Sequence, residues 1–266
     1  MLGIVQGRLT FSGRKLQCFP KKPLNEFKLA SKIGYDFIEF FGERTKNENN
    51  PIWLDEGIKS YIKASKKYNL KIYSFCDDYI INHSLSSKKT LYVILKIINQ
   101  LYKLKIKKYI LPLYGKSLIN KKNKKKILEN LSIISKICKI KKIVLVIESN
   151  MSPKKFLSLK KKIKTNNFYF LFDTGNRVLL KKESVLDIYE FKNELKHIHL
   201  KDKNLKNKNV NFGKGEVKFI PIFKALKKIN YKGSFTIESQ RGKNIENQAK
   251  ENYIFFKKLI NKYLSK

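Results

Sequence analysis

The chain has 266 residues, of which 42% are hydrophobic, and this is enough for the core of one large domain. No apolar run approaches the roughly 18–20 residues that span a bilayer, and the first residues lack the apolar segment of a signal peptide. The three cysteines are far apart and form no CxxC pair, so we expect no disulfide framework, no membrane partner and a cytoplasmic location.

The net charge of +38 is extreme, and a basic chain of this kind suggests a nucleic-acid partner. However, the excess is almost all lysine, whereas proteins that read nucleic acids commonly use arginine. Lysine is spread over nearly every helical segment beside residues of A/T-rich codons, so genome composition is the simpler explanation. We therefore expect salt-sensitive, non-specific binding to polyanions and no specific nucleic-acid partner.

The first half of the chain alternates short apolar runs with longer, lysine-rich amphipathic stretches. Gly34 follows the first of these stretches and is typical of a helix C-cap. The expected strands are 2–6, 37–41, 70–75 and 108–112, and the expected helices are 24–33, 54–68, 87–104 and 121–138.

The second half repeats this rhythm. The branched apolar run 143–147 is typical of a strand buried on both faces. Ser152 and Pro153 are favourable residues for the start of the helix that follows. The expected strands are 143–147, 168–172, 197–200 and 234–237, and the expected helices are 153–164, 183–191, 220–229 and 247–263.

Eight strand–helix units in this length predict an α/β fold of the (β/α)₈ TIM-barrel type, in a single domain over residues 1–266. A doubly wound open sheet is the alternative, but no GxGxxG follows the first strand. The polar loops 45–51 and 203–211 are expected to flank the site.

Four polar residues lie where the predicted strands end: Glu148, Asp173, His199 and Glu238. In a barrel the carboxyl ends of the strands converge on one rim, where active sites lie. Each residue alone has an ordinary structural explanation. Together, three carboxylates and an imidazole after buried-looking strands predict a site for one divalent metal ion, with Mn²⁺, Mg²⁺ or Co²⁺ favoured by the oxygen-rich ligand set.

Several short motifs also occur in a characteristic order. They are Ile147-Glu148-Ser149, Phe172-Asp173-Thr174-Gly175-Asn176, His197-Ile198-His199-Leu200-Lys201-Asp202, Gly213-Lys214-Gly215-Glu216-Val217 and Phe235-Thr236-Ile237-Glu238, with Val5-Gln6-Gly7-Arg8-Leu9, Leu16-Gln17-Cys18-Phe19-Pro20, Gly34-Tyr35-Asp36-Phe37-Ile38-Glu39, Asp78-Tyr79 and His83 before them. In order and spacing the chain resembles the sugar phosphate isomerase/epimerase family, the xylose isomerase-like barrels, over essentially its whole length.

The resemblance implies that Glu148, Asp173, His199 and Glu238 are metal ligands, and that Glu148 and Glu238 also form the catalytic acid/base pair. The implied reaction moves a proton next to the carbonyl of a small sugar or sugar phosphate through a metal-stabilised enediolate. Two carboxylates on opposite faces of the sugar would give epimerisation, and one carboxylate acting on one face would give aldose–ketose isomerisation.

One position departs from the family pattern, which often has His three residues after the Asp ligand. Asn176 stands there in this chain. Asn can hydrogen-bond a substrate hydroxyl but cannot donate a proton at neutral pH. The metal site is therefore still expected, whereas the substrate and the exact reaction stay open.

Further residues near strand ends are candidates for substrate binding: Asn176, Lys201, Arg241, Glu39, His83, Gln6 and His197. Packing in the core is an equally good explanation for His197, and ordinary surface charge is one for Lys201. The backbone of Gly213-Lys214-Gly215 could receive a phosphate, although a turn explains these glycines equally well.

Three other functions stay open at this point. An endonuclease IV-like nuclease would suit the positive charge, but its multi-zinc site draws on more histidines than the three in this chain. A dehydratase could expel a hydroxyl from the same enediolate, and a sugar-binding barrel without turnover would explain Asn176. A homo-oligomer is compatible with the family, but no interface can be identified from the sequence.

Overall fold

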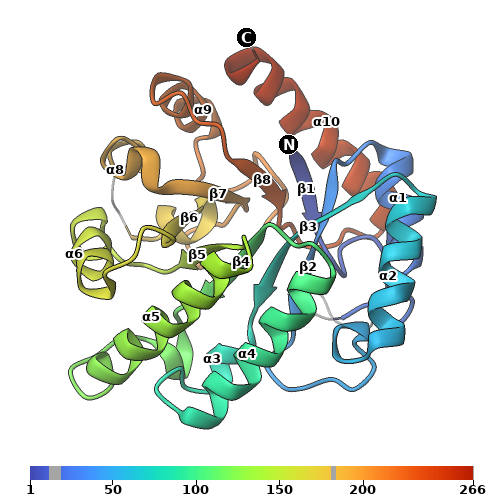
Figure 1. Ribbon diagram of the computed structural model, residues 1–266. Helices are drawn as coiled ribbons and strands as arrows, with labels where there is room; N and C mark the ends of the chain where they lie inside the picture. The colour runs from blue at the N-terminus through green and yellow to red at the C-terminus, as the bar shows by residue number, and fades with distance from the viewer. Residues whose placement is uncertain (12–18, 181–183, 266) are drawn as a thin grey trace. The chain divides into compact units, whose positions relative to one another are not determined.

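The computed structural model describes residues 1–11, 19–180 and 184–265 (Figure 1). Its eight strands close into a barrel in chain order. The strands are β1 Leu2–Val5, β2 Phe37–Gly42, β3 Lys71–Asp77, β4 Lys108–Pro112, β5 Val144–Glu148, β6 Tyr169–Asp173, β7 Leu195–Leu200 and β8 Ser234–Ile237. The predicted (β/α)₈ barrel is confirmed, and the alternative of a doubly wound open sheet is wrong.

Helices alternate with these strands along the chain. They are α1 Asn25–Ile33, α2 Asp55–Lys67, α3 Tyr79–Asn82, α4 Lys88–Lys103, α5 Lys124–Ile140, α6 Pro153–Ile163, α7 Thr174–Val178, α8 Ser184–Phe191, α9 Phe219–Lys228 and α10 Ile245–Leu264, with 3₁₀ helices η1 Pro51–Trp53, η2 Gly115–Ser117 and η3 Lys192–Glu194. None of the helices in the described part of the chain is long and apolar enough to cross a membrane.

Each predicted strand and long helix is present, with ends that differ by up to three residues. The prediction missed α3 and α7, because one turn of helix is too short to show an amphipathic period. The helix α3 lies in the segment 78–83, directly after β3. Residue 183, the first of one predicted helix, and residues 16–18 of one motif lie outside the described residues.

The chain divides into two compact units. The first unit, Met1–Ile38 with Phe170–Lys266, contains parallel pairs that join β6, β7, β8 and β1, and in it α10 packs against α1 and α9. The second unit, Glu39–Tyr169, contains the parallel pairs that join β3, β4 and β5, and in it α5 packs between α4 and α6.

One turn recurs where a helix leads into the next strand. A residue with positive φ follows the helix, and its N–H donates to the carbonyl oxygen three residues earlier. The next residue is apolar, and its N–H donates to the carbonyl oxygen five residues before it. Gly34, Asn69, Lys105, Lys142 and Asn230 hold this position. Only Gly34 was predicted, because glycine is the usual signal for this turn and the other four positions lack it.

Candidate functional site

The two carboxylate oxygens of Asp173, the last residue of β6, have different partners. Oδ1 accepts a hydrogen bond from the backbone N–H of Asn176 at 2.8 Å and so caps the N-terminus of α7. Oδ2 lies 2.8 Å from Nζ of Lys201. The cap fixes the carboxylate and leaves one oxygen facing the ammonium.

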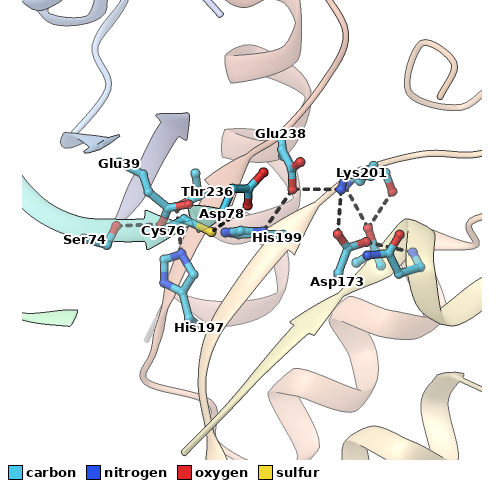
Figure 2. Close-up of polar contacts among 12 residues, drawn as sticks. Glu39, Ser74, Cys76, Asp78, Asp173, His197, His199, Lys201, Thr236 and Glu238 are labelled. Atoms are coloured by element: carbon cyan, nitrogen blue, oxygen red, sulfur yellow. Dashed lines mark hydrogen bonds and ion pairs between the residues drawn. The ribbon is translucent and has the colours of Figure 1, made fainter. Parts of the chain in front are cut away.

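His199 and Glu238 come to the same place from the neighbouring strands β7 and β8 (Figure 2). Asp173 and His199 are register partners, and the backbone N–H of Glu238 donates to the carbonyl of Leu200 at 2.9 Å. Oε2 of Glu238 lies 3.0 Å from Nδ1 of His199 and 2.8 Å from Nζ of Lys201. Three of the four predicted ligands therefore lie together in the first unit.

These groups are almost completely removed from solvent. Asp173 is 2% exposed, Glu238 4% and Lys201 6%. Burial alone would raise the pKa of Glu238, but the ammonium of Lys201, the hydrogen bond and charge of His199 and the charge of Arg8 hold that pKa well below its usual range. Glu238 is therefore a buried carboxylate that stays ionised.

His197 lies on the same side of β7 as His199, with ring centroids 5.3 Å apart. Its Nδ1 lies 2.6 Å from Oγ of Ser234, and its Nε2 lies 2.9 Å from Oγ1 of Thr236. Both ring nitrogens therefore contact hydroxyl groups of β8, and the ring packs beneath His199.

The residues after β1 form a turn that is held from two sides. The carboxylate of Glu26 accepts hydrogen bonds from the backbone N–H groups of Gly7, Leu9 and Thr10 at 2.7–3.0 Å. Nη1 of Arg241 donates to the carbonyl oxygen of Gly7 at 2.8 Å. In this structure Arg241 thus binds the backbone of the turn.

Within the same turn, Gln6 and Arg8 are both buried. Arg8 also acts on the site electrostatically, because its charge helps to lower the pKa of Glu238. Gln6 stays a candidate for the substrate side of the site.

The turn Gly213–Gly215 was a candidate phosphate cradle, and the structure corrects this. The N–H groups of Gly213 and Gly215 donate to Oδ2 of Asp202 at 2.9 and 3.1 Å, and the N–H of Val217 donates to Oδ1 at 3.2 Å. A Cβ at Gly215 would lie 2.2 Å from Oδ1 of Asp202. These donors bind a carboxylate of the chain itself, so they are not available to a phosphate.

Asn176 lies on α7, and its Oδ1 accepts a hydrogen bond from Nζ of Lys203 at 2.7 Å. The side chain is half-buried. The position where the family often has His is therefore occupied by an amide that pairs with a lysine.

The second unit contains three of the predicted site residues, Glu39, His83 and Glu148. Glu39 is fully buried, and its Oε2 accepts a hydrogen bond from Oγ of Ser74 at 2.7 Å. His83 stacks on the ring of Tyr79 with centroids 3.9 Å apart, and its Nδ1 lies 3.0 Å from the carbonyl oxygen of Tyr79. Glu148 is the last residue of β5 and is buried.

Sequence reasoning missed several buried charged residues, among them Glu26, Asp202 and Arg177. Arg177 on α7 pairs with Asp187 of α8, and its guanidinium lies 5.5–5.8 Å from the ring centroids of Phe170, Phe172 and Phe191. The position of Glu26 in the first turn of an amphipathic helix was a usable signal. The partners of Asp202 lie in the turn that follows β7, and those of Arg177 lie in β6 and α8, so no local pattern identifies them.

This chain is similar in sequence to a curated relative and similar in structure to several solved proteins. An inosose dehydratase of Clostridium botulinum (strain Alaska E43 / Type E3) is 33% identical over 100 residues, which are 31% of this chain and 34% of that protein. The match thus spans about a third of the length of this curated relative.

Among solved structures, D-psicose 3-epimerase from Clostridium cellulolyticum H10 with D-tagatose has a TM-score of 0.77 and 16% identity, covering 97% of this chain and 99% of that one. L-ribulose 3-epimerase has a TM-score of 0.80 and 16% identity, covering 98% and 95%. At these identities the similarity establishes the fold.

Residues 27–259 match the family described as xylose isomerase-like TIM barrel, which confirms the resemblance found in the motifs. The chain therefore belongs to the xylose isomerase-like TIM barrel family.

Proposed function

We propose that the chain is an enzyme that holds one divalent metal ion and moves a proton next to the carbonyl group of a small sugar or sugar phosphate. One observation carries the proposal: two buried carboxylates, those of Asp173 and Glu238, converge on a single cationic group, Nζ of Lys201, at 2.8 Å each. Burying two carboxylates together costs several kcal/mol unless positive charge compensates them, so this is a place built for a cation.

The donor set fits a divalent ion of the Mn²⁺, Mg²⁺ or Co²⁺ kind. Asp173 and Glu238 supply carboxylate oxygens, and His199 supplies an imidazole nitrogen 3.0 Å from Glu238. We propose Glu148 as the fourth ligand, because β5 precedes β6 in the barrel and parallel strands end at one rim. Glu148, Asp173 and His199 are each buried and each offers one ligand atom.

The proposed chemistry divides between the ion and the side chains. A bound ion would draw electron density from the carbonyl oxygen of the substrate and make the adjacent C–H more acidic. Glu238, which stays ionised when buried, is suited to accept that proton. Glu148, as the second carboxylate, would return a proton to the opposite face in an epimerase.

The remaining candidates would form the walls of the substrate site. We propose that Glu39, Gln6, His83 and Asn176 bind sugar hydroxyls, since Glu39 lies in β2 and the others come after β1, β3 and β6. Lys201 would bind a substrate oxygen. His197 and Arg241, which contact hydroxyls of β8 and the turn after β1, would support the site from behind.

The names of the similar proteins suggest two candidate reactions for this chain. The two structures compared above are sugar 3-epimerases, and the curated relative is an inosose dehydratase. Proton removal next to a carbonyl is the first step of either reaction. A dehydratase would then release a hydroxyl from the neighbouring carbon, so this is the second candidate function.

A test of the function follows the proton and the product. The Mn²⁺-loaded protein is incubated in D₂O with a panel of ketoses, ketose phosphates and inososes. Deuterium at the carbon next to the carbonyl without loss of water supports an isomerase or epimerase, and an unsaturated or deoxy product supports the dehydratase. A protein that exchanges no proton of any of these compounds would contradict both.

The same assay tests the acid/base pair. Glu148→Gln and Glu238→Gln are each expected to slow exchange at least about 10²–10⁴-fold, the usual contribution of a positioned acid or base. Glu190→Gln, an exposed residue of α8, serves as the control and should leave the rate unchanged. Near wild-type exchange in either site variant removes that residue from the role.

A further inference from the structure

Backbone hydrogen bonds and packing of the side-chain stem, in addition to its charge, fix the position of Lys201 in the site. Its backbone N–H donates to Oγ1 of Thr174 at 2.9 Å, and its carbonyl accepts from the same hydroxyl at 2.6 Å. A Cβ at Gly175 would lie 3.0 Å from Cγ of Lys201, so the side-chain stem runs directly over this glycine. Figure 2 shows the ammonium between Asp173 and Glu238.

The contacts of the ammonium involve atoms that a metal ion would need. Nζ lies 2.8 Å from Oδ2 of Asp173 and 2.8 Å from Oε2 of Glu238. The other oxygen of Asp173 already caps α7, which leaves Oδ2 as the oxygen facing the site. A divalent ion binds such oxygens at about 2.0–2.2 Å, so it would lie very close to a like charge if the ammonium stayed in place.

We propose that Lys201 is an internal counter-ion that exchanges places with the metal ion. Without the ion, its ammonium neutralises Asp173 and Glu238 and keeps their carboxylates in position. When the ion binds, the ammonium leaves these two oxygens and becomes available to an oxygen atom of the substrate. This inference rests on the proposed metal site and adds a competition between a lysine and the ion.

If Lys201 competes with the ion, removal of its ammonium should strengthen metal binding. If Lys201 instead supported the metal ligands, the same change should weaken metal binding. Lys201→Met removes the ammonium but keeps an unbranched stem over Gly175. Mn²⁺ should then bind roughly tenfold more tightly or better, and the metal-free protein should unfold at a lower temperature, because two buried carboxylates lose their compensating charge. The gap between the unfolding temperatures of the metal-free and Mn²⁺-loaded protein should widen.

The measurements are calorimetric titration of the EDTA-treated protein with Mn²⁺ and thermal unfolding with and without Mn²⁺. Lys203→Met is the matched control, since Lys203 lies two residues further on and its ammonium donates to the amide oxygen of Asn176. It should change neither the affinity for Mn²⁺ nor the gap. If Lys201→Met does not fold without metal, Lys201→Gln keeps one donor and should show the same signs at smaller size.

The outcomes separate this inference from the proposed function. Tighter Mn²⁺ binding with a less stable metal-free protein supports it. Equal or weaker Mn²⁺ binding in both Lys201 variants, with clear binding by the wild type, overturns it and leaves the metal site standing. No Mn²⁺ binding by the wild type or by any variant overturns both.

Discussion

Two buried acids, Asp77 in one unit and Glu238 in the other, have partners of different charge. In the unit Glu39–Tyr169, Glu39 accepts a hydrogen bond from Ser74, and Asp77 at the end of β3 accepts one from the hydroxyl of Tyr109 at 2.5 Å. In the other unit, Asp173 and Glu238 face the ammonium of Lys201. Asp77 thus meets a hydroxyl donor, whereas Asp173 and Glu238 meet an ammonium.

The partners determine the charge of these acids. Burial raises the pKa of Asp77 to about 6, although hydrogen bonds from Tyr109 and from the backbone of Tyr79 act in the opposite direction. The pKa of Glu238, which is just as buried, lies well below its usual range because of its cationic neighbours. A hydroxyl partner therefore allows a buried acid to become neutral, whereas an ammonium keeps it ionised and ready to bind a metal or accept a proton.

The largest expected effect on stability comes from removing a buried cation. Arg177→Met leaves the buried carboxylate of Asp187 without its partner and should cost about 3–5 kcal/mol of unfolding free energy. Tyr109→Phe removes a hydroxyl from an acid that can become neutral and should cost only about 1–2 kcal/mol. Urea unfolding at pH 7 measures both.

A double variant controls for packing around Arg177. Arg177→Met with Asp187→Leu removes both charges and should recover most of the loss, because no charge is then left buried. Equal losses for Arg177→Met and Tyr109→Phe would contradict the contrast between ionic and neutral partners of buried acids.

The next effect is a difference in pH dependence. Because the pKa of Asp77 is raised from 3.8 to about 6 on folding, its stabilising contribution is complete below about pH 4 and is lost as the pH rises through 6. The pKa of Glu238 is lowered, so its contribution is present above its ordinary value of 4.5 and is lost on acidification. The two acids should therefore act in opposite directions.

Asp77→Asn isolates the first contribution. Its unfolding free energy, relative to the wild type, should rise by up to roughly 3 kcal/mol between pH 4 and pH 7. Urea midpoints at pH 4, 5, 6 and 7 measure this, with Glu129→Gln as a control because its pair with Lys126 is exposed. Parallel pH curves for Asp77→Asn and the wild type would show that Asp77 does not titrate in this way.

The smallest effect concerns a feature that both units share. Lys142 and Asn230 hold the same left-handed position after a helix, with φ of 58° and 53°. Asn tolerates this conformation better than Lys, so glycine should stabilise more at Lys142, by about 0.5–1 kcal/mol, than at Asn230. Lys136→Gly, inside α5, should instead destabilise by about 1 kcal/mol. A loss of stability in Lys142→Gly would contradict the assignment of strain to this turn.

Much of the fold follows from the sequence because barrel strands are short apolar runs that alternate with amphipathic helices. The run 143–147 and its neighbours could be placed within a few residues. The short helices α3 and α7 could not, since one turn carries no period.

The candidate site was predictable where a polar residue directly ends an apolar run, as with Asp173 and Glu238. The position of Lys201 was not, because the sequence does not reveal that its long side chain turns back onto two acids of neighbouring strands. The partners of Asp202 were missed for a similar reason: its hydrogen bonds reach residues 11–15 positions further along the chain.

The central claim is that this barrel holds a metal ion through His199 and its neighbouring carboxylates. The most direct measurement is the metal content of the purified protein after Mn²⁺ loading and gel filtration, for the wild type and for His199→Ala. We expect about one ion per wild-type chain and a large loss in the variant, since imidazole is one of only four proposed ligands. No bound metal in the wild type, or the same content in His199→Ala, would contradict the account.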